Sequence, residues 1–355
     1  MNQSITPPKH RLRVFDAMRG FSMVLVVIGH VLMNCNPANG QTLLQNIIGT
    51  FYMPLFFLIS GFFAFKQSSR WTSSILKKQF RNKVASLLIC SIVFFTLLRY
   101  CQNQDIFGWI NHGFGAYWFT ICLFEMFMIY YFSVAVSILF KRDIILVLMV
   151  VVSLSGLVIM LKNPLSNHLL WTILGGSNLC LFLQYFTLGL FFRRYKDEAL
   201  KLITRNWVIT TLTIAWIVML CIHLKGLSLP YLLDKIFSVI VLPYTALFFV
   251  VALFVVSKDY FEKDNHISNN LCIVGRRSLD VYMIHYFFLP ALPVLSSLVS
   301  PNNMIFFQIA VGLTVSIPII TISVFIGSLL RKSETISSWI FGVNKSELTH
   351  TYNAK

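Results

Sequence analysis

Long apolar runs alternate with short polar segments over most of this 355-residue chain. About 20 consecutive apolar residues suffice to cross the roughly 30 Å hydrocarbon core of a bilayer as an α-helix. The pattern therefore predicts an all-α, polytopic membrane bundle of about ten transmembrane helices. The predicted spans are Val14–Met33, Leu43–Phe65, Val84–Tyr100, Tyr117–Phe140, Ile144–Leu161, Leu179–Phe192, Trp207–Leu224, Ile236–Val256, Ser278–Leu298 and Met304–Leu330.

The basic residues divide unequally between the two sides that these spans define. With the N-terminus in the cytoplasm, 25 of the 29 Lys and Arg residues lie on the cytoplasmic side and four on the other. Cytoplasmic loops of membrane proteins carry such an excess, so both termini are expected to be cytoplasmic. Residues 1–330 are then expected to form one membrane domain, and residues 331–355 a short cytoplasmic tail.

Composition supports a membrane protein and argues against nucleic-acid binding. Hydrophobic residues make up 57% of the chain and charged residues only 12%, whereas soluble domains carry about 25% charged residues. The net charge of +16 would suit a nucleic acid, but the basic residues cluster in short loops between apolar runs. That distribution indicates membrane topology, with the lipid bilayer as the partner. The seven cysteines are scattered singly, without metal-site spacing or a disulfide framework.

Arg19 and His30 are the most informative polar residues, because both lie on the first apolar run. Eleven positions make almost a whole number of helical turns, so the two side chains share a face, with His30 roughly 16 Å deeper. An ionisable residue at that depth is costly and is a functional candidate by default. A buried imidazole is kept neutral and suits a general base; a packing histidine is the alternative. Arg19 could anchor the helix at the membrane surface, and Asp16, one turn earlier, could pair with it.

Two further ionisable residues fall inside apolar runs. His285 lies about 12 Å beyond Arg277 along the ninth run, where a hydrogen bond between helices is the alternative to a catalytic role. Glu125 lies about 12 Å along the fourth run, where a carboxylate needs a partner or a water-filled cavity. Trp118 precedes it near the membrane interface, where an aromatic belt is the plain explanation.

Three features of the apolar runs predict local helix geometry. Pro54 predicts a kink in the second run, because proline removes a hydrogen bond of the helix. The small pair Ser60-Gly61 predicts the close approach of another helix. Ser278 is expected to cap the ninth run, and Asp280 suits the positive end of that helix dipole.

Basic residues next to the runs are candidates for binding an anionic cofactor. Residues 66–83 hold six basic residues and no acid, which topology alone can explain. The functional alternative is a site for phosphate groups, since clustered Lys and Arg bind phosphate well. The candidates are Lys78 and Arg81, together with Arg276 and Arg277 before the ninth run. The sequence lacks a Gly-rich phosphate loop, which argues against a nucleotide-hydrolysing motor.

Four segments share motifs with a known family. The first is Asp16-x-x-Arg19-Gly20, with ten residues between Arg19 and His30. The other three are Phe51–Gly61 (F-x-M-P-L-F-F-x-x-S-G), Trp118–Phe124 (W-F…L-F) and Gly275–His285 (G-x-x-S-L-x-x-Y-x-I-H). In this order, on ten apolar runs, they resemble the integral-membrane acyltransferase-3 family, which includes bacterial sugar O-acetyltransferases. Tyr52 departs from the pattern, because members often have a histidine there.

The resemblance implies transfer of an acyl group, usually acetyl from cytoplasmic acetyl-CoA, to a hydroxyl of a carbohydrate or lipid-linked sugar in the bacterial inner membrane. His30 would act as general base, and Arg19 would position the donor or polarise its thioester carbonyl. An acyl-His30 intermediate is the alternative route. Asp16, Glu125, His285, Tyr52 and Trp118 would support these two residues. The resemblance implies no metal, and assembly as a homo-oligomer stays open.

Two other functions compete with acyl transfer. A proton-coupled transporter of a sugar or small organic acid would use His30, Glu125 and His285 as a proton relay. Against it, transporters often carry internal repeats with broken helices in matching positions, and the sequence has no such pairing. A passive scaffold for envelope-polysaccharide synthesis would leave these buried ionisable residues without a purpose.

Overall fold

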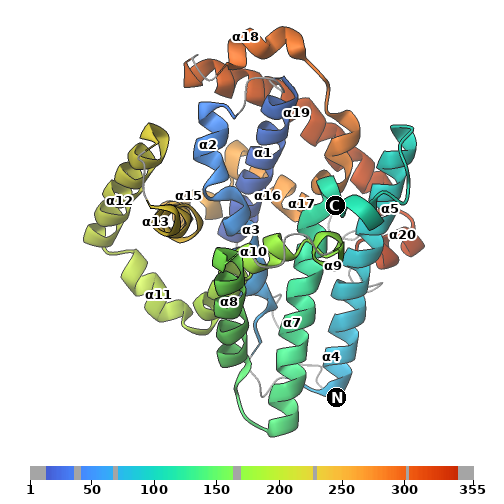
Figure 1. Ribbon diagram of the computed structural model, residues 1–355, viewed down its shortest axis with the longest axis vertical. Coiled ribbons are helices and arrows are strands. Elements are labelled where there is room, and N and C mark those ends of the chain that lie inside the picture. Colours follow the sequence, from blue (N-terminus) through green and yellow to red (C-terminus); the bar gives the residue numbers. More distant parts are fainter. Residues whose placement is uncertain are drawn as a thin grey trace.

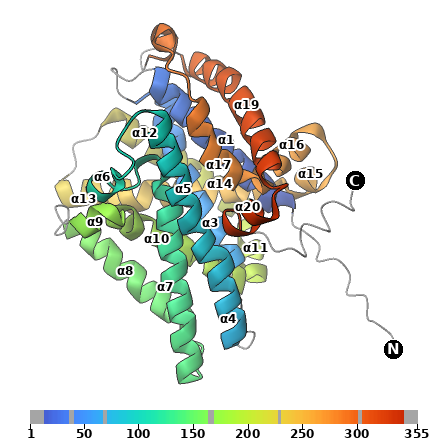
Figure 2. The ribbon, with the colours of Figure 1, turned by 90° about the vertical axis from the view of Figure 1, so that its right-hand side faces the viewer.

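The computed structural model describes residues 13–35, 41–66, 71–162, 169–226, 230–300 and 304–342. Every regular element in these ranges is a helix, which confirms the predicted all-α class. The helices form a bundle in which distant parts of the chain lie together (Figure 1, Figure 2). The first helix, α1 (Arg13–Cys35), packs against α16 (His266–Arg276) and α19 (Ile305–Leu330), near the other end of the sequence.

Seven helices or continuous helical runs in the described residues are long and apolar enough to cross a membrane. Each coincides with a predicted span, as expected of an integral membrane protein. They are α1; α2 (Leu43–Gly49) with α3 (Tyr52–Ala64); α4 (Ser73–Gln79) with η2 (Phe80–Ala85) and α5 (Ser86–Cys101); η3 (Gly115–Tyr117) with α7 (Trp118–Phe140); α12 (Asn206–Lys225); α13 (Tyr231–Ile236) with η4 (Phe237–Val241) and α14 (Leu242–Val256); and α19.

The other three predicted spans are helical but are not among these seven. The apolar part of α8 (Ile145–Lys162) is shorter, and α10 (Gly176–Arg194) is continuous but carries Asn178 and Gln184. The ninth predicted span is broken. The number of spans and the orientation of the termini therefore stay predictions. Short helices form the connections: α6 (Trp109–His112), α9 (Leu169–Ile173), α11 (Lys196–Ile203), α15 (Lys258–Glu262) and α20 (Glu334–Trp339).

The break in the ninth predicted span has a clear physical cause. The helix α17 (Ser278–Ile284) tightens into the 3₁₀ turn η5 (His285–Phe288), and the chain then bends by 97° before η6 (Pro293–Leu295) and α18 (Ser296–Val299). Pro290 and Pro293 lie at the bend, and neither can donate a backbone hydrogen bond to the preceding turn. His285 thus lies where the regular helix ends. Ser278 is the first residue of α17 rather than its cap, so that capping prediction was wrong.

The second predicted span is also interrupted, and the place differs from the predicted kink at Pro54. The chain leaves the helix at Thr50 and Phe51, between α2 and α3, and Pro54 is the third residue of the new helix. The first turn of a helix leaves its backbone N–H groups without helical partners, so proline costs no hydrogen bond there. The break brings Tyr52 to the start of α3.

Glycines let α3 and α10 touch backbone to backbone, as the Ser60-Gly61 pair predicted. A Cβ atom on Gly61 would lie 2.0 Å from the carbonyl oxygen of Phe186, and one on Gly189 would lie 2.0 Å from that of Leu58. Neither position has room for a larger side chain unless a helix moves. The contact of α1 with α16 is equally close, through Gly20 and Gly275. The helix that carries His30 is therefore fixed in depth and rotation.

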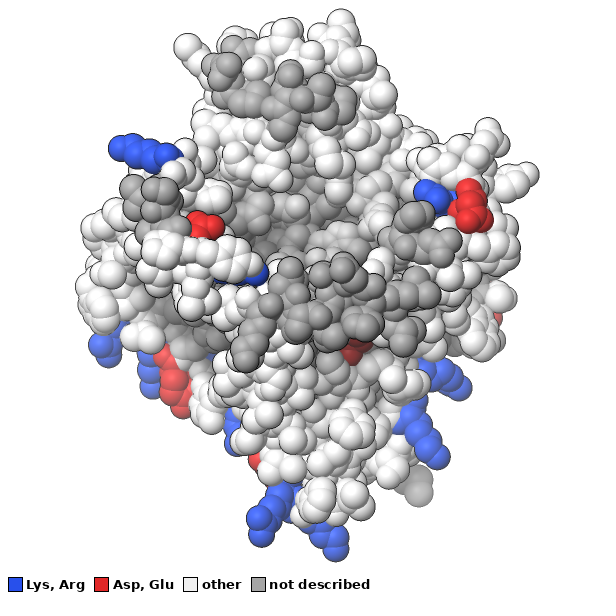
Figure 3. Space-filling view, viewed as in Figure 1, with Lys and Arg blue, Asp and Glu red and all other residues white. Residues whose placement is uncertain are grey.

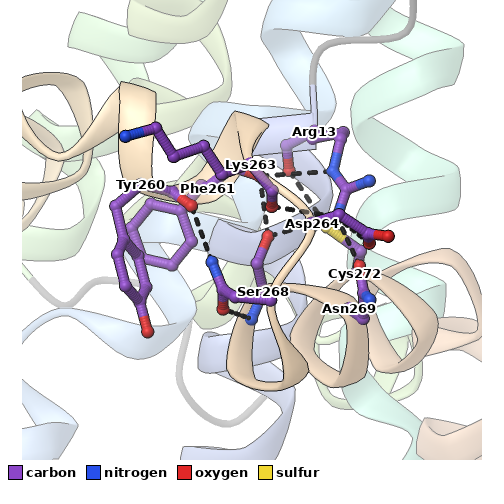
Figure 4. Close-up of polar contacts among 9 residues, drawn as sticks. Arg13, Tyr260, Phe261, Lys263, Asp264, Ser268, Asn269 and Cys272 are labelled. Atoms are coloured by element: carbon purple, nitrogen blue, oxygen red, sulfur yellow. Dashed lines mark hydrogen bonds and ion pairs between the residues drawn. The ribbon is translucent and has the colours of Figure 1, made fainter.

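Arg13 fixes the start of α1 to the connection between α15 and α16 (Figure 4). Its guanidinium donates hydrogen bonds to the carbonyl oxygen of Phe261, at 3.2 Å, and to the side chains of Ser268 and Asn269. Asp264 lies 3.8 Å away as an ion-pair partner. This arginine, which topology alone would explain, holds together two segments about 250 residues apart in the chain.

Residues 331–342 pack on the bundle instead of leaving it. A Cβ atom on Gly342 would lie 2.2 Å from the carbonyl oxygen of Asn82, and Ser337 of α20 is buried. The Arg331 guanidinium lies over the Phe341 ring and binds Asp280 of α17. The rest of the predicted tail, 343–355, lies outside the described residues.

Candidate active site

His30 lines a pocket of about 450 Å³ in the half of the bundle where α1 ends. The walls come from α1, the α2–α3 region, α10, α12 and the start of α14. Its polar lining includes His30, Tyr52 and Tyr185, with Gln45, Asn46, Thr50, His223 and Ser238 around them. In Figure 3 the surface is hollowed near the centre of this face, and the Lys and Arg side chains gather below it. A chamber of this size, with convergent hydroxyl, amide and imidazole groups, suits a small polar molecule.

His30, His285 and Tyr286 form a contact cluster at this pocket. The His30 Nε2 atom and the Tyr286 hydroxyl are hydrogen-bonded at 2.9 Å. The two imidazole rings lie 5.4 Å apart, and the His285 ring packs 4.0 Å from the Tyr286 ring. His285 is fully buried, its Nδ1 atom bonds the Val281 carbonyl oxygen at 2.9 Å, and its Nε2 has no partner among the described residues. The fold thus brings the two histidines together, while the predicted supporting role of His285 stays a prediction.

The start of α7 holds this cluster in place. The Tyr117 hydroxyl donates to the carbonyl oxygen of Met283 at 3.0 Å, and the Tyr282 hydroxyl donates to that of Ala116 at 2.8 Å. The Tyr117 ring also lies 5.4 Å from the Tyr286 ring. Because helix η5 is short and irregular, these bonds from outside the helix fix the backbone that carries His285 and Tyr286.

Trp118 and Tyr52 also belong to the pocket region, in different ways. Tyr52 lines the pocket directly and is half-buried. Trp118 stacks on Phe182 at 5.4 Å, and Phe182 is a wall residue that also stacks on Phe57. Trp118 therefore packs behind the wall, and its predicted supporting role stays a prediction.

Glu125 does not reach this pocket. It is buried on α7, and both carboxylate oxygens lack a hydrogen-bond partner among the described residues. The structure leaves its predicted supporting role untested.

Arg19 and Asp16 lie at the other end of α1 and do not line the His30 pocket. The Arg19 guanidinium lies 4.7 Å from the centre of the Phe63 ring, and Asp16 is buried. One helix thus carries two separated polar regions. Because α1 is continuous from Arg13 to Cys35, the eleven positions from residue 19 to residue 30 correspond to roughly 16 Å along its axis.

A second, narrower pocket of about 90 Å³ lies at this end of α1. Phe15 and Met18 of α1 line it together with Leu58 and Phe62 of α3, and Lys196 and Lys258 also contribute. The Arg193 guanidinium lies over the Phe62 ring at 5.1 Å. The pocket is therefore apolar inside and cationic around it.

The four residues predicted to bind an anionic cofactor are not part of either pocket. Lys78 and Arg81 are exposed on α4 and η2, and Arg276 is exposed at the end of α16. Arg277 bonds Asp280 at 3.4 Å. Their predicted role depended on charge clustering alone, and the fold separates them from the interior cavities.

The residue that sequence reasoning missed is Tyr286. It lies 256 positions from His30, so no periodicity along the chain connects the two. The available signal was its position directly after His285. Lys196 and Lys258 were counted only as topology residues, because neither forms part of a motif.

The fold and the site define a polytopic membrane protein with a buried imidazole cluster beside a polar chamber. The family model for the acyltransferase-3 type, described as an acyltransferase domain, matches residues 12–330. The chain therefore belongs to the acyltransferase-3 family, and its function is acyl transfer in the general sense. No curated protein and no solved structure matches it.

Proposed function

We propose that this protein is a membrane O-acyltransferase that moves an acyl group, most simply acetyl, from acyl-CoA to a hydroxyl of a carbohydrate or lipid-linked sugar of the bacterial envelope. The observation that carries the proposal is the hydrogen-bonded His30–Tyr286 pair at a pocket of about 450 Å³ in which polar groups converge within a partly apolar lining. Amide, hydroxyl and aromatic side chains of that lining suit a sugar, which presents hydroxyls and apolar ring faces.

In this proposal His30 accepts the proton of the acceptor hydroxyl. Its Nε2 is hydrogen-bonded to the Tyr286 hydroxyl. The proposed mechanism uses the tautomer in which Nε2–H donates to the phenolic oxygen, because that tautomer leaves Nδ1 as the base. The acceptor oxygen then forms a bond to the thioester carbonyl carbon, and the carbon–sulfur bond breaks. The imidazolium returns its proton to the thiolate, so that atoms and charge balance.

The donor is proposed to enter at the opposite end of α1. The narrow pocket there offers an apolar lining for the acyl and pantetheine arm, with Lys196 and Lys258 for phosphate groups. Met18 lines this pocket and His30 lines the polar one. Twelve residues of helix separate them, so the arm would bridge roughly 18 Å. Arg19 lies between them along α1 and is suited to meet the thioester.

Replacing Tyr286 with phenylalanine is expected to lower kcat about tenfold and to leave KM nearly unchanged. The ring stays in place, but the imidazole N–H loses its acceptor and is held less firmly, a loss of about 1.4 kcal/mol in the transition state. Initial rates with purified protein and radiolabelled acetyl-CoA measure this. Tyr195→Phe, on an exposed tyrosine, is the control. A wild-type kcat in the Tyr286→Phe variant would show that the Tyr286 hydroxyl takes no part in the reaction.

Reversing the charge of Lys196 and Lys258 together is expected to raise KM for acetyl-CoA about tenfold, which corresponds to about 1.4 kcal/mol of binding. Because these residues would contact the donor far from its thioester, kcat should change little. The matched variant Lys201→Glu, on the same helix α11 but outside the pocket, should keep the wild-type KM. An unchanged KM in the double variant would mean that the donor enters elsewhere.

The decisive test of the function is mass spectrometry of envelope glycans and lipids from cells with and without the gene. A mass difference of one acyl group, restored by the wild-type protein, supports the proposal and names both acyl group and acceptor. Purified protein that neither binds nor consumes labelled acetyl-CoA, while it moves a sugar or acid across vesicles, would establish the transporter alternative instead.

A further inference from the structure

A third pocket, of about 340 Å³, lies at the junction of α7 and α8 and takes no part in the proposed reaction. Trp71 and Ser137 are buried in its lining, and Lys141, Arg142 and Asp143 are exposed at it. The pocket follows directly on the apolar run that ends at Phe140, so it lies where a membrane surface would be.

The charge at this pocket is positive. Its single acid among the described lining residues, Asp143, is already paired with Arg194 of α10 at 3.1 Å. Lys141 and Arg142 therefore face the pocket without a neutralising carboxylate in its lining. The Lys66 ammonium adds a third cation nearby, 5.1 Å from the centre of the Trp71 ring. An anionic group would gain from all three.

The backbone at Lys141 is held in an uncommon conformation. Its φ of 51° is left-handed, which glycine or asparagine adopts most easily at the end of a helix. The Ser137 hydroxyl donates to the carbonyl oxygen of Arg142 and closes the turn. The fold thus keeps two adjacent cations in a fixed turn, where glycine or asparagine at position 141 would be less strained.

The surface beside this turn is apolar. Leu139 is 76% exposed, Phe140 63% and Val147 61%, all on the same two helices. A ligand with both an anionic head and hydrocarbon chains therefore matches the pocket and its flank at once. The pocket is also a whole helix away from Trp118 and the His30 chamber, roughly 33 Å along α7. A molecule bound here is not positioned to react at His30.

We propose that the α7–α8 pocket binds the phosphodiester headgroup of an anionic membrane lipid, whose acyl chains lie along Leu139, Phe140 and Val147. The phosphate meets Lys141 and Arg142, and the glycerol end packs against Trp71. Such a lipid, free inorganic phosphate and the nucleotide end of coenzyme A all present phosphate groups that these cations could bind. The apolar flank favours the lipid.

The test measures binding of phosphatidylglycerol and phosphatidylcholine to the delipidated full-length protein by native mass spectrometry. Wild type should prefer phosphatidylglycerol. The variant Lys141→Asn/Arg142→Gln removes both charges and keeps a residue that tolerates the left-handed turn. It should lose about 25-fold in that preference, since each basic residue at an anionic surface contributes about fivefold. The matched variant Lys201→Gln/Arg205→Gln removes two exposed charges from the end of α11 and should behave as wild type.

One further variant and one competition experiment complete the test of the lipid site. The variant Ile138→Trp fills the pocket without changing charge, and it should also lose the preference. A competition experiment distinguishes a lipid site from a general phosphate site. Inorganic phosphate and adenosine 3′,5′-bisphosphate should not displace the bound lipid. Wild-type preference retained in both pocket variants, or displacement by either soluble phosphate compound, would overturn the lipid site.

Discussion

The variant His30→Ala is expected to lose acyl transfer while it still inserts and accumulates. A positioned general base contributes about 10²–10⁴-fold, so the rate should fall by that factor. The fold should survive, because His30 lines a pocket and is only half-buried, so its removal enlarges an existing cavity instead of opening one in a packed core. Labelled acetyl-CoA with purified protein measures the rate, and size-exclusion elution measures the fold.

Two comparisons make the His30 result interpretable. His266→Ala removes an exposed histidine at the start of α16 and should leave the rate unchanged. His30→Gln keeps polar contact with Tyr286 but has no basic nitrogen, so it should be nearly as inactive as alanine. Wild-type turnover in either His30 variant would mean that another group takes the proton. His285, whose Nε2 has no partner in the described part of the chain, would be the next candidate.

Asp280→Asn is expected to destabilise the protein by about 3–5 kcal/mol, because it leaves the half-buried guanidinium groups of Arg331 and Arg277 without their buried counter-charge. Asp280 is fully buried, accepts from Arg331 Nε at 2.8 Å and bonds Arg277 at 3.4 Å. This ion pair ties the start of α17 to the end of α19. Chemical or thermal unfolding of the detergent-purified protein would show the loss.

A double variant separates charge from packing at this pair. Asp280→Asn/Arg331→Gln removes both charges of the main pair, and it should recover a measurable part of the lost stability. Asp234→Asn, on an exposed aspartate of α13, should unfold like wild type. Since α17 leads into His285 and Tyr286, Asp280→Asn should also lower the acyl-transfer rate. A melting temperature equal to that of wild type would show that the pair does not hold α17.

The apolar pattern predicted the helices well, because burial in a bilayer demands the same thing of every spanning segment, a long uncharged run. Seven of the predicted spans coincide with helical runs of sufficient length. The ninth was predicted as continuous, and Pro290 and Pro293 were the signal against it. The apolar run Leu169–Leu174 is compatible in sequence with either an extension of the sixth predicted span or a separate half-helix, and the structure has the separate short helix α9 there.

The residues of the candidate site were likewise only partly predictable from the sequence. His30 and His285 stood out by themselves, because an ionisable residue inside an apolar run is rare enough to mark a position. The basic residues proposed to bind the cofactor could not be singled out in this way, because Lys and Arg are common in all cytoplasmic loops of membrane proteins. Arg277 illustrates this: it binds Asp280.

Local chemistry in the chain thus settled the helical class, the membrane environment and the polar positions that matter, since each follows from the solvation of a single segment. Packing decided which of those positions meet. The hydrogen bond between His30 and Tyr286 and the chamber walls from five parts of the chain both depend on contacts between distant helices. Such contacts arise from backbone approaches, like those at Gly20 and Gly61, that are absent until the helices are assembled.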